Sequence, residues 1–358
     1  DYQVIQQVAQ QMMGANALYE ITCGDGDTDI YEQRTDFELQ DTVRWSDTLR
    51  TVQGIGYRQD KVASETFMGG TVRSDQWLAF VNAEYRPLAP LLVSAAAMVE
   101  YDSENPLRFS PRLGMNYLFG QQQSVRLQVS RSRRSPDLAE RYLQTSAGLS
   151  HMTSNYLNQD NGALFYNASA DSWRDDLNDE RLFAWEVGYY GYFYRSSLQI
   201  NVKYFEEHMD DLISTRVTLN STSLANQGGM NIRGLEGQVN WQPAYGQSLM
   251  LGWLLQDREA DRASELILGA EQAFRLMWTR RAAGFEQSLG AVYDRNVLND
   301  GGGSRKGAYQ QKKLIWRLAA DTAAGQFYWA GTYDALYDQV LYDNTPRWLN
   351  RLGWNYEW

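Results

Sequence analysis

The feature that most constrains the fold is an alternation of apolar and polar side chains with a period of two, which recurs along most of the chain. In the stretch SSLQINVKY, the apolar positions are Leu198, Ile200, Val202 and Tyr204, and the polar ones are Gln199, Asn201 and Lys203. Successive side chains of a β-strand point to opposite faces, so this pattern predicts strands with one apolar and one polar face. About fifteen segments show it: 31–45, 48–60, 76–86, 91–102, 108–119, 124–134, 181–191, 194–215, 229–242, 247–258, 269–281, 285–297, 308–320, 326–342 and 346–358.

The length and the spacing of these segments favour a membrane barrel. Strands of soluble proteins have about 5–6 residues, whereas a tilted membrane strand needs about 9–11, and the segments here have about ten or more. Tight connections such as 120–123 and 243–246 alternate with longer polar ones such as 60–75, 216–228 and 134–180. Short periplasmic turns and long extracellular loops are typical of an outer-membrane barrel. The predicted fold class is therefore all-β, a transmembrane antiparallel β-barrel with about 15–16 strands in this chain.

Aromatic residues make up 13% of the chain and cluster near the ends of the predicted strands. This placement is typical of the aromatic girdles of membrane barrels. The chain ends on RLGWNYEW, where Trp354, Tyr356 and Trp358 occupy every second position. We expect a last strand that closes against the first and has no free edge. Its aromatic end resembles the signal that the barrel-assembly machinery of Gram-negative bacteria reads.

Composition excludes several other classes of protein. The longest nearly continuous apolar run is Leu91–Val99, which is too short for a membrane helix of about 20 residues. A net charge of -11 argues against a nucleic-acid partner, because binding to phosphates requires clustered Lys and Arg. A single cysteine and two histidines leave little for a metal cluster. No nucleotide-binding loop, nucleophile elbow or zinc-protease motif is present, so neither an enzyme nor a cofactor is predicted.

Three stretches resemble the barrel of TonB-dependent outer-membrane receptors. Phe109–Tyr142 is similar to a family region in which S-P-R opens one strand and R-x-P with L-x-E closes the next; the residues here include Pro111, Arg112, Arg134, Pro136 and Glu140. Val202–Ser214 and Asn226–Trp241 resemble paired strands of the family, with Asp211, Gly234 and Glu236 at recurring positions. Phe37–Asp60 resembles an earlier hairpin of the barrel.

The resemblance implies a fold, a location and partners. It implies an outer-membrane protein surrounded by lipid, with a 22-stranded barrel and a small ligand such as a ferric siderophore. It also implies an N-terminal plug that the TonB–ExbB–ExbD complex moves. Neither a plug nor a TonB box is evident in this chain. We therefore expect the C-terminal two thirds of a receptor, a plug supplied separately, or a reduced barrel.

The expected organisation has two parts. Residues 1–30 are predicted to be an extracellular loop segment with a short helix, because Val4, Ile5, Val8 and Met12 recur at helical spacing. Residues 31–358 are predicted to be barrel strands, and residues 135–180 their longest extracellular loop.

Arg131, Arg133 and Arg134 precede this loop and are candidate contacts for an anionic ligand, because the guanidinium group binds oxyanions as a fork. The alternation predicts that Arg134 points into the lumen and that Arg133 points outward or to the rim. The alternative is a structural ion-pair network with neighbouring carboxylates.

Within the loop, the candidate ligand contacts are His151, Tyr156, Tyr166, Trp173 and Arg174. A connection of this length is functional or disordered more often than structural. The same side chains could instead only pack the loop against its neighbours.

The spacing of Asp25, Asp27 and Asp29 is that of a calcium loop, although the twelfth position is Asp36 rather than glutamate. These residues are a weak candidate for a metal site, and a solvated acidic loop is the alternative.

Two other functions remain compatible with the sequence. One is a passive porin or polysaccharide-export barrel without energy coupling. The other is a soluble β-rich carbohydrate-binding or adhesive protein, which would stay soluble without detergent.

Overall fold

The structure is a computed structural model. It describes residues 25–26, 29–103, 105, 107–120, 122–142, 146–150, 164–167, 177–217, 222–261, 270–299, 305–338 and 347–355. The helix expected within residues 1–30 lies outside these ranges. Among the described residues, no helix is long and apolar enough to cross a membrane.

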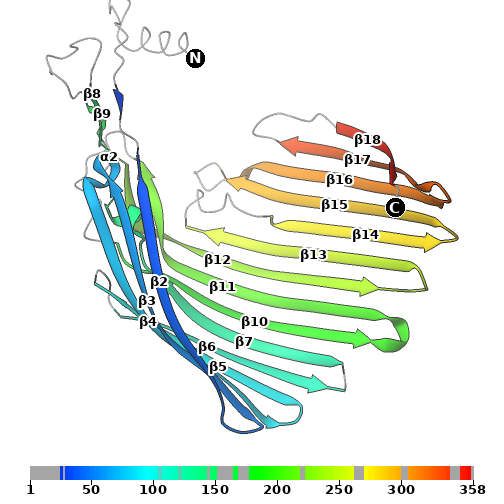
Figure 1. The fold of residues 1–358 in the computed structure, drawn as a ribbon, viewed down its shortest axis with the longest axis horizontal. Helices are drawn as coiled ribbons and strands as arrows, with labels where there is room; N and C mark the ends of the chain where they lie inside the picture. Colours follow the sequence, from blue (N-terminus) through cyan, green and yellow to red (C-terminus); the bar gives the residue numbers. More distant parts are fainter. Residues whose placement is uncertain are drawn as a thin grey trace, which may run out of the picture.

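Fifteen antiparallel strands form one curved sheet, in which neighbours in the sequence are neighbours in space (Figure 1). They are β2 (Tyr31–Arg44), β3 (Leu49–Ser64), β4 (Gly70–Leu88), β5 (Leu91–Asp102), β6 (Arg108–Phe119), β7 (Gln123–Arg134), β10 (Glu180–Phe193), β11 (Leu198–Val217), β12 (Thr222–Trp241), β13 (Gln247–Ala260), β14 (Gln272–Ala282), β15 (Phe285–Asn299), β16 (Arg305–Thr322), β17 (Gly325–Asp338) and β18 (Arg347–Asn355). Each of the fifteen predicted segments overlaps one of these strands, which confirms the all-β prediction.

The remaining elements are small. A separate sheet contains β1 (Asp25–Gly26), β8 (Ser146–Ser150) and β9 (Leu164–Asn167). The short helices are α2 (Glu65–Met68), α3 (Leu138–Tyr142) and the 3-10 turn η3 (Tyr194–Ser196).

The predicted loop 60–75 is mostly strand. β3 continues to Ser64 and β4 begins at Gly70, so only the single turn of α2 separates them. The Ser64 hydroxyl accepts from the Phe67 amide at 3.2 Å, and Gly69 ends the helix at a φ of 62°. The same correction applies to 216–228, because β11 runs to Val217 and β12 begins at Thr222. A polar stretch can continue as a β-strand, because its backbone N–H and C=O groups still form hydrogen bonds with the neighbouring strand.

Short and long connections segregate to opposite ends of the sheet, as predicted. We call these ends the turn end and the loop end. At the turn end, Gly246 joins β12 to β13 with a φ of 72°. A Cβ at this position would overlap the carbonyl oxygen of Arg281, so both the conformation and the space require glycine.

The two faces of the sheet differ in chemistry, and we call them the apolar face and the polar face. On the apolar face, Phe37 is 64% exposed and Leu352 is 81% exposed. The only buried hydrophobic residues among those described are Met68, Leu138, Phe205 and Ala319. A soluble β-protein would bury its apolar side chains between two layers, whereas this single layer leaves a large apolar surface of the kind that marks contact with a membrane or with another protein.

Aromatic residues form two rows on the apolar face. Tyr57 and Trp77 are paired toward the loop end, with ring centroids 4.7 Å apart. Phe327 and Trp354 are paired at the turn end, with centroids 6.2 Å apart. From Trp77 to Tyr85 on β4, a strand tilted by about 40° rises about 20 Å across a membrane at about 3.3 Å per residue. This height is comparable to the apolar band of about 25 Å on membrane barrels.

The sheet does not close on itself. Its edges are β2 and β18, so the expectation that the last strand closes against the first is wrong for the described strands. An odd number of strands excludes a closure in which every neighbouring pair is antiparallel. In an antiparallel sheet of fifteen strands the first and last run in the same direction, and they cannot pair with each other antiparallel.

Candidate functional site

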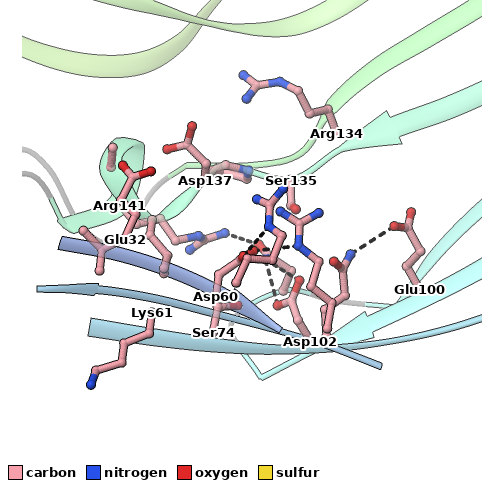
Figure 2. Close-up of a pocket in the computed structure, with 18 of the residues that line it drawn as sticks. Glu32, Asp60, Lys61, Ser74, Glu100, Asp102, Arg134, Ser135, Asp137 and Arg141 are labelled. Atoms are coloured by element: carbon pink, nitrogen blue, oxygen red, sulfur yellow. Dashed lines mark hydrogen bonds and ion pairs between the residues drawn. The ribbon is translucent and has the colours of Figure 1, made fainter. Parts of the chain in front are cut away.

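A cavity of about 770 Å³ lies at the loop end, between the polar face of β2–β6 and the segment Arg133–Arg141 (Figure 2). We call it the loop-end cavity. Its wall on the sheet is built by residues that oppose one another across neighbouring strands. Arg34 pairs with Asp60, Gln76 pairs with Asp102, and Glu100 pairs with Arg108.

The wall is rich in ion pairs. Asp60 accepts from Arg34 at 2.6 Å and lies 2.8 Å from the Nε of Arg58. Gln76 donates to Glu100 at 3.0 Å. These contacts hold side chains of β2 to β5 in fixed positions, which is the condition for a preorganised site.

Arg108 lies at the base of the cavity and is 1% exposed. Its Nη1 donates to Asp102 Oδ2 at 2.7 Å, and Asn105 donates to both oxygens of Asp102 at 2.8 and 2.9 Å. The Nη2 atom of Arg108 has no hydrogen-bond partner among the described residues. A buried guanidinium with only part of its donors satisfied is uncommon in proteins.

Pro111 helps to create the space around Arg108. β6 stays paired with β5 as far as Arg108, but its ladder with β7 extends only to the pair Arg112 and Ser130. Proline has no N–H to donate and is tolerated where a ladder ends. β6 and β7 therefore separate at the loop end, where the cavity lies.

The segment above the cavity is held by Arg134. Its guanidinium donates to both oxygens of Glu140 at 2.9 Å each and to Glu180 at 2.5 Å. Asp137 and Glu140 exchange bonds between side chain and backbone, at 2.9 and 2.7 Å, as in a capping box that begins α3. In Figure 2, Arg134 lies above the labelled carboxylates of the cavity, and no dashed line joins it to them.

Asp179 lies beside the cluster and is 8% exposed. It forms an ion pair with Arg133, whose Nη1 lies 3.8 Å from Oδ2, and neither carboxylate oxygen has a hydrogen-bond partner among the described residues. Burial raises the pKa of Asp179, and the charges of Arg108 and Arg133 oppose that rise. Arg141 contributes its charge too, and it donates to Asn105.

The structure separates the three arginines that the sequence grouped. Arg133 lines the cavity, Arg134 lines it but is occupied by two carboxylates, and Arg131 pairs with Phe183 in the register of β7 and β10. Tyr166 lies in β9, whereas His151, Tyr156, Trp173 and Arg174 lie outside the described residues. Their role in ligand binding stays a prediction.

Asp211 occupies an irregularity in the ladder of β11 and β12, with a φ of 56°. Its carboxylate pairs with Arg181 at 2.5 Å, and its carbonyl accepts from Asn226 at 2.6 Å. Asn226 also bonds both the N–H and the C=O of Asn178, at 2.6 and 2.9 Å. The stretches 210–213 and 226–228 are therefore the two sides of one bulge.

The other motif residues lie lower on the polar face. Arg112 donates to Gln128, and Glu236 pairs with Lys203 at 3.1 Å. Gly234 lies under the Phe205 ring, where a Cβ would come within 2.7 Å of Cζ. Pro136 belongs to the segment above the cavity.

The metal candidate receives no support from the described residues, which contain no group of three or more potential metal ligands. Asp25 lies in β1, Asp29 precedes β2, and Asp27 lies outside the described residues. At the C-terminus, Trp354 donates to the Ala324 carbonyl at 2.7 Å, and Tyr356 and Trp358 lie outside the described residues.

Sequence reasoning missed Arg108, Arg141, Asp102 and Asn105. They lie on the two sides of a short connection and in a helix of one turn, with no motif that distinguishes them. The available signal was weak. Asp102 and Arg108 continue the polar alternation of their strands toward the loop end.

Comparison with known families gives one model that covers nearly the whole chain. The family described as TonB dependent receptor-like, beta-barrel matches residues 14–358. A search of curated proteins finds no match.

Solved structures with a similar fold are all distant in sequence. The siderophore receptor PirA from Pseudomonas aeruginosa is 13% identical at a TM-score of 0.60, over 90% of this chain and 54% of that one. The FrpB iron transporter from Neisseria meningitidis (apoprotein form of the F5-1 variant) is 12% identical at a TM-score of 0.62, over 88% and 53%. A mutant of the ferric enterobactin receptor PfeA from Pseudomonas aeruginosa is 11% identical at a TM-score of 0.60, over 85% and 48%. The chain thus spans about half the length of these proteins, and at such identities the likeness concerns the fold.

Proposed function

Because the chain belongs to the family of TonB-dependent receptor β-barrels, we propose that it is the barrel wall of an outer-membrane receptor that imports a ferric siderophore. The observation that carries the proposal is the family match over residues 14–358. Family members are receptors and transporters rather than enzymes, so no catalytic step is proposed.

The two-faced sheet supports an outer-membrane location. The apolar face would contact lipid and the polar face would line the lumen. The turn end would then face the periplasm, and the loop end with its cavity would face the exterior. Residues 135–180 would form part of the external surface that first meets the ligand.

Energy coupling is the second part of the proposal. Import would require a plug and the TonB–ExbB–ExbD complex, and the barrel-assembly machinery would insert the barrel. The structural neighbours include a siderophore receptor and an iron transporter, which supports ferric siderophores as the class of ligand to test first.

The test is uptake of radiolabelled iron presented on a panel of siderophores, in cells with and without the gene, under iron limitation. We expect uptake of at least one chelate that depends on both the gene and TonB. Gene-dependent uptake that persists without TonB would instead indicate a passive pore. Absence of the protein from the outer-membrane fraction would contradict the proposal altogether.

A further inference from the structure

Two buried groups of opposite charge beside the loop-end cavity, Arg108 and Asp179, have side-chain atoms without a hydrogen-bond partner among the described residues. Arg108 is 1% exposed, and its Nη2 has no hydrogen-bond acceptor among the described residues. Asp179 is 8% exposed, and neither of its carboxylate oxygens has a hydrogen-bond donor among them. The Nε atoms of Arg133 and Arg141 are also without hydrogen-bond partners among the described residues. Buried polar groups in folded proteins are rarely left in this state, and a bound water or ion is one of the explanations for those that are.

The unsatisfied donors belong to one connected cluster. Arg141 donates to Asn105, Asn105 donates to Asp102 at 2.8 Å, and Asp102 accepts from Arg108 at 2.7 Å. Arg108, Arg133 and Arg141 all line the loop-end cavity. The cluster therefore gathers several buried N–H groups without hydrogen-bond partners, all from residues that line this cavity.

The chemistry of these donors selects the ligand group. A guanidinium keeps its charge and presents its N–H groups in a plane that matches the two oxygens of a carboxylate or phosphate. Asp102 already occupies the Nη1 of Arg108, so the Nη2 remains for a second acceptor.

We propose that the loop-end cavity is an oxyanion site, in which Arg108 with Arg141 and Arg133 binds a carboxylate or phosphate group carried by the solute. Asp179 is the internal carboxylate that competes for the same arginines. The proposal rests on the proposed receptor function, because a lumen open to the exterior gives a solute access to this cavity.

Asp179 gives the site a defined behaviour. It interacts electrostatically with Arg108, Arg133 and Arg141, yet its ion pair with Arg133 is long, at 3.8 Å, and none of the three donates a hydrogen bond to it. An entering oxyanion would reach the arginines more closely than Asp179 does. Removal of the charge of Asp179 should therefore strengthen anion binding rather than weaken it.

The experiment is isothermal titration calorimetry of the full-length protein in detergent, with citrate and inorganic phosphate as probes at constant ionic strength. We expect saturable binding of at least one probe to the wild type. Arg108→Lys keeps the charge but loses the fork, and it should weaken binding at least tenfold, which is about 1.4 kcal/mol. Asp179→Asn should bind the probe more tightly.

Two controls separate the site from folding and from general charge. Arg73→Lys makes the same substitution on the apolar face of β4, where Arg73 pairs with Lys61, and should leave the affinity unchanged. If Arg108→Lys does not assemble, the double variant Arg108→Gln with Asp102→Asn replaces the buried ion pair by a neutral pair of similar shape. This variant should assemble and lose the binding.

Equal affinity in the wild type and in an assembled Arg108 variant would overturn the proposal, and so would the lack of saturable binding to both the wild type and Asp179→Asn. Preference for citrate would identify a carboxylate as the group bound, and preference for phosphate a phosphoryl group; either supports the site. Anion binding without siderophore uptake would reject the proposed cargo and keep the site. Siderophore uptake without anion binding would keep the proposed cargo and reject the oxyanion site.

Discussion

At the scale of single residues, Arg134 belongs to a sequence motif whose contacts stabilise the fold. It donates to Glu140 and Glu180, which lie 6 and 46 residues away in the sequence. Glu180 in turn accepts from the backbone of Ile213 at 2.7 Å. The R-x-P and L-x-E residues therefore link β7, α3, β10 and β11 at the loop end. This geometry favours the ion-pair alternative for Arg134, while Arg133 remains directed to the cavity.

Asp211 makes the sharpest prediction at this scale. Its φ of 56° lies in the left-handed region, which aspartate and asparagine tolerate better than other non-glycine residues. Asp211→Val should lower the free energy of unfolding by about 1–2 kcal/mol, because a β-branched residue is strained there. Asp211→Asn should change it by less than about 0.5 kcal/mol, since the pair with Arg181 is partly exposed and screened.

Unfolding in denaturant, followed by tryptophan fluorescence in detergent or lipid, measures the difference. Asp210→Val is the matched control, because Asp210 is not among the residues with positive φ. An equal loss of stability at both positions would show that backbone strain is not the cause.

At the scale of elements, β11 tests which face of the sheet meets lipid. Val202 lies between Tyr189 of β10 and Gly237 of β12, on the apolar face, and its neighbour Asn201 lies on the polar face. An arginine at position 202 near the membrane midplane should cost about 2–4 kcal/mol, and one at position 201 much less. Folding equilibria of both variants in lipid vesicles measure the two costs. Similar costs at the two positions would reject this orientation of the sheet.

The last strand tests assembly. In β18, Trp354 stacks on Phe327 with centroids 6.2 Å apart and donates to Ala324, and it is 54% exposed on the apolar face. Trp358→Ala, or deletion of residues 351–358, should leave the chain unassembled, because an aromatic end on this strand is the expected assembly signal. Heat-modifiable migration on a gel and protease sensitivity report assembly.

Trp45→Ala is a suitable control for this experiment. Trp45 is 63% exposed in the turn between β2 and β3 and donates to Thr51 at 2.8 Å. Its loss should leave assembly intact, so that failure of both variants would point to a general loss of aromatic surface instead of a terminal signal.

At the scale of the whole molecule, the sheet and the loop 135–180 should behave as separable parts. α3 and both partners of Arg134, Glu140 and Glu180, lie outside residues 150–170, and the described part of 150–170 pairs only within the small sheet. Replacement of 150–170 by a short Gly/Ser linker should therefore keep the assembled sheet. Ligand affinity of the full-length protein should fall, because the aromatic candidates Tyr156 and Tyr166 are removed. Wild-type affinity in an assembled deletion variant would contradict this role of the loop.

The sequence by itself determined the strands and their faces. Side-chain alternation is a local property of an extended backbone, and a lipid-facing strand must be apolar at every second residue over its whole membrane span. For this reason all fifteen strands, the short turns and the aromatic rows could be predicted from composition and period. In 60–64 and 70–75 the strands continue through polar sequence, which lacks the alternation of apolar and polar residues. The predicted strands therefore ended too early there.

Only the tertiary structure decided which polar side chains meet. Arg34, Asp60, Asp102, Arg108 and Arg141 come from five segments, and their proximity depends on the register of β2 to β6 and on the path of the chain after β7. Register and loop path follow from backbone pairing and from contacts between distant residues, whereas the alternation of one strand is the same in every register that keeps its faces. The cavity, the unsatisfied donors of Arg108 and the separation of Arg133 from Arg134 were therefore beyond what the pattern of any single segment contains.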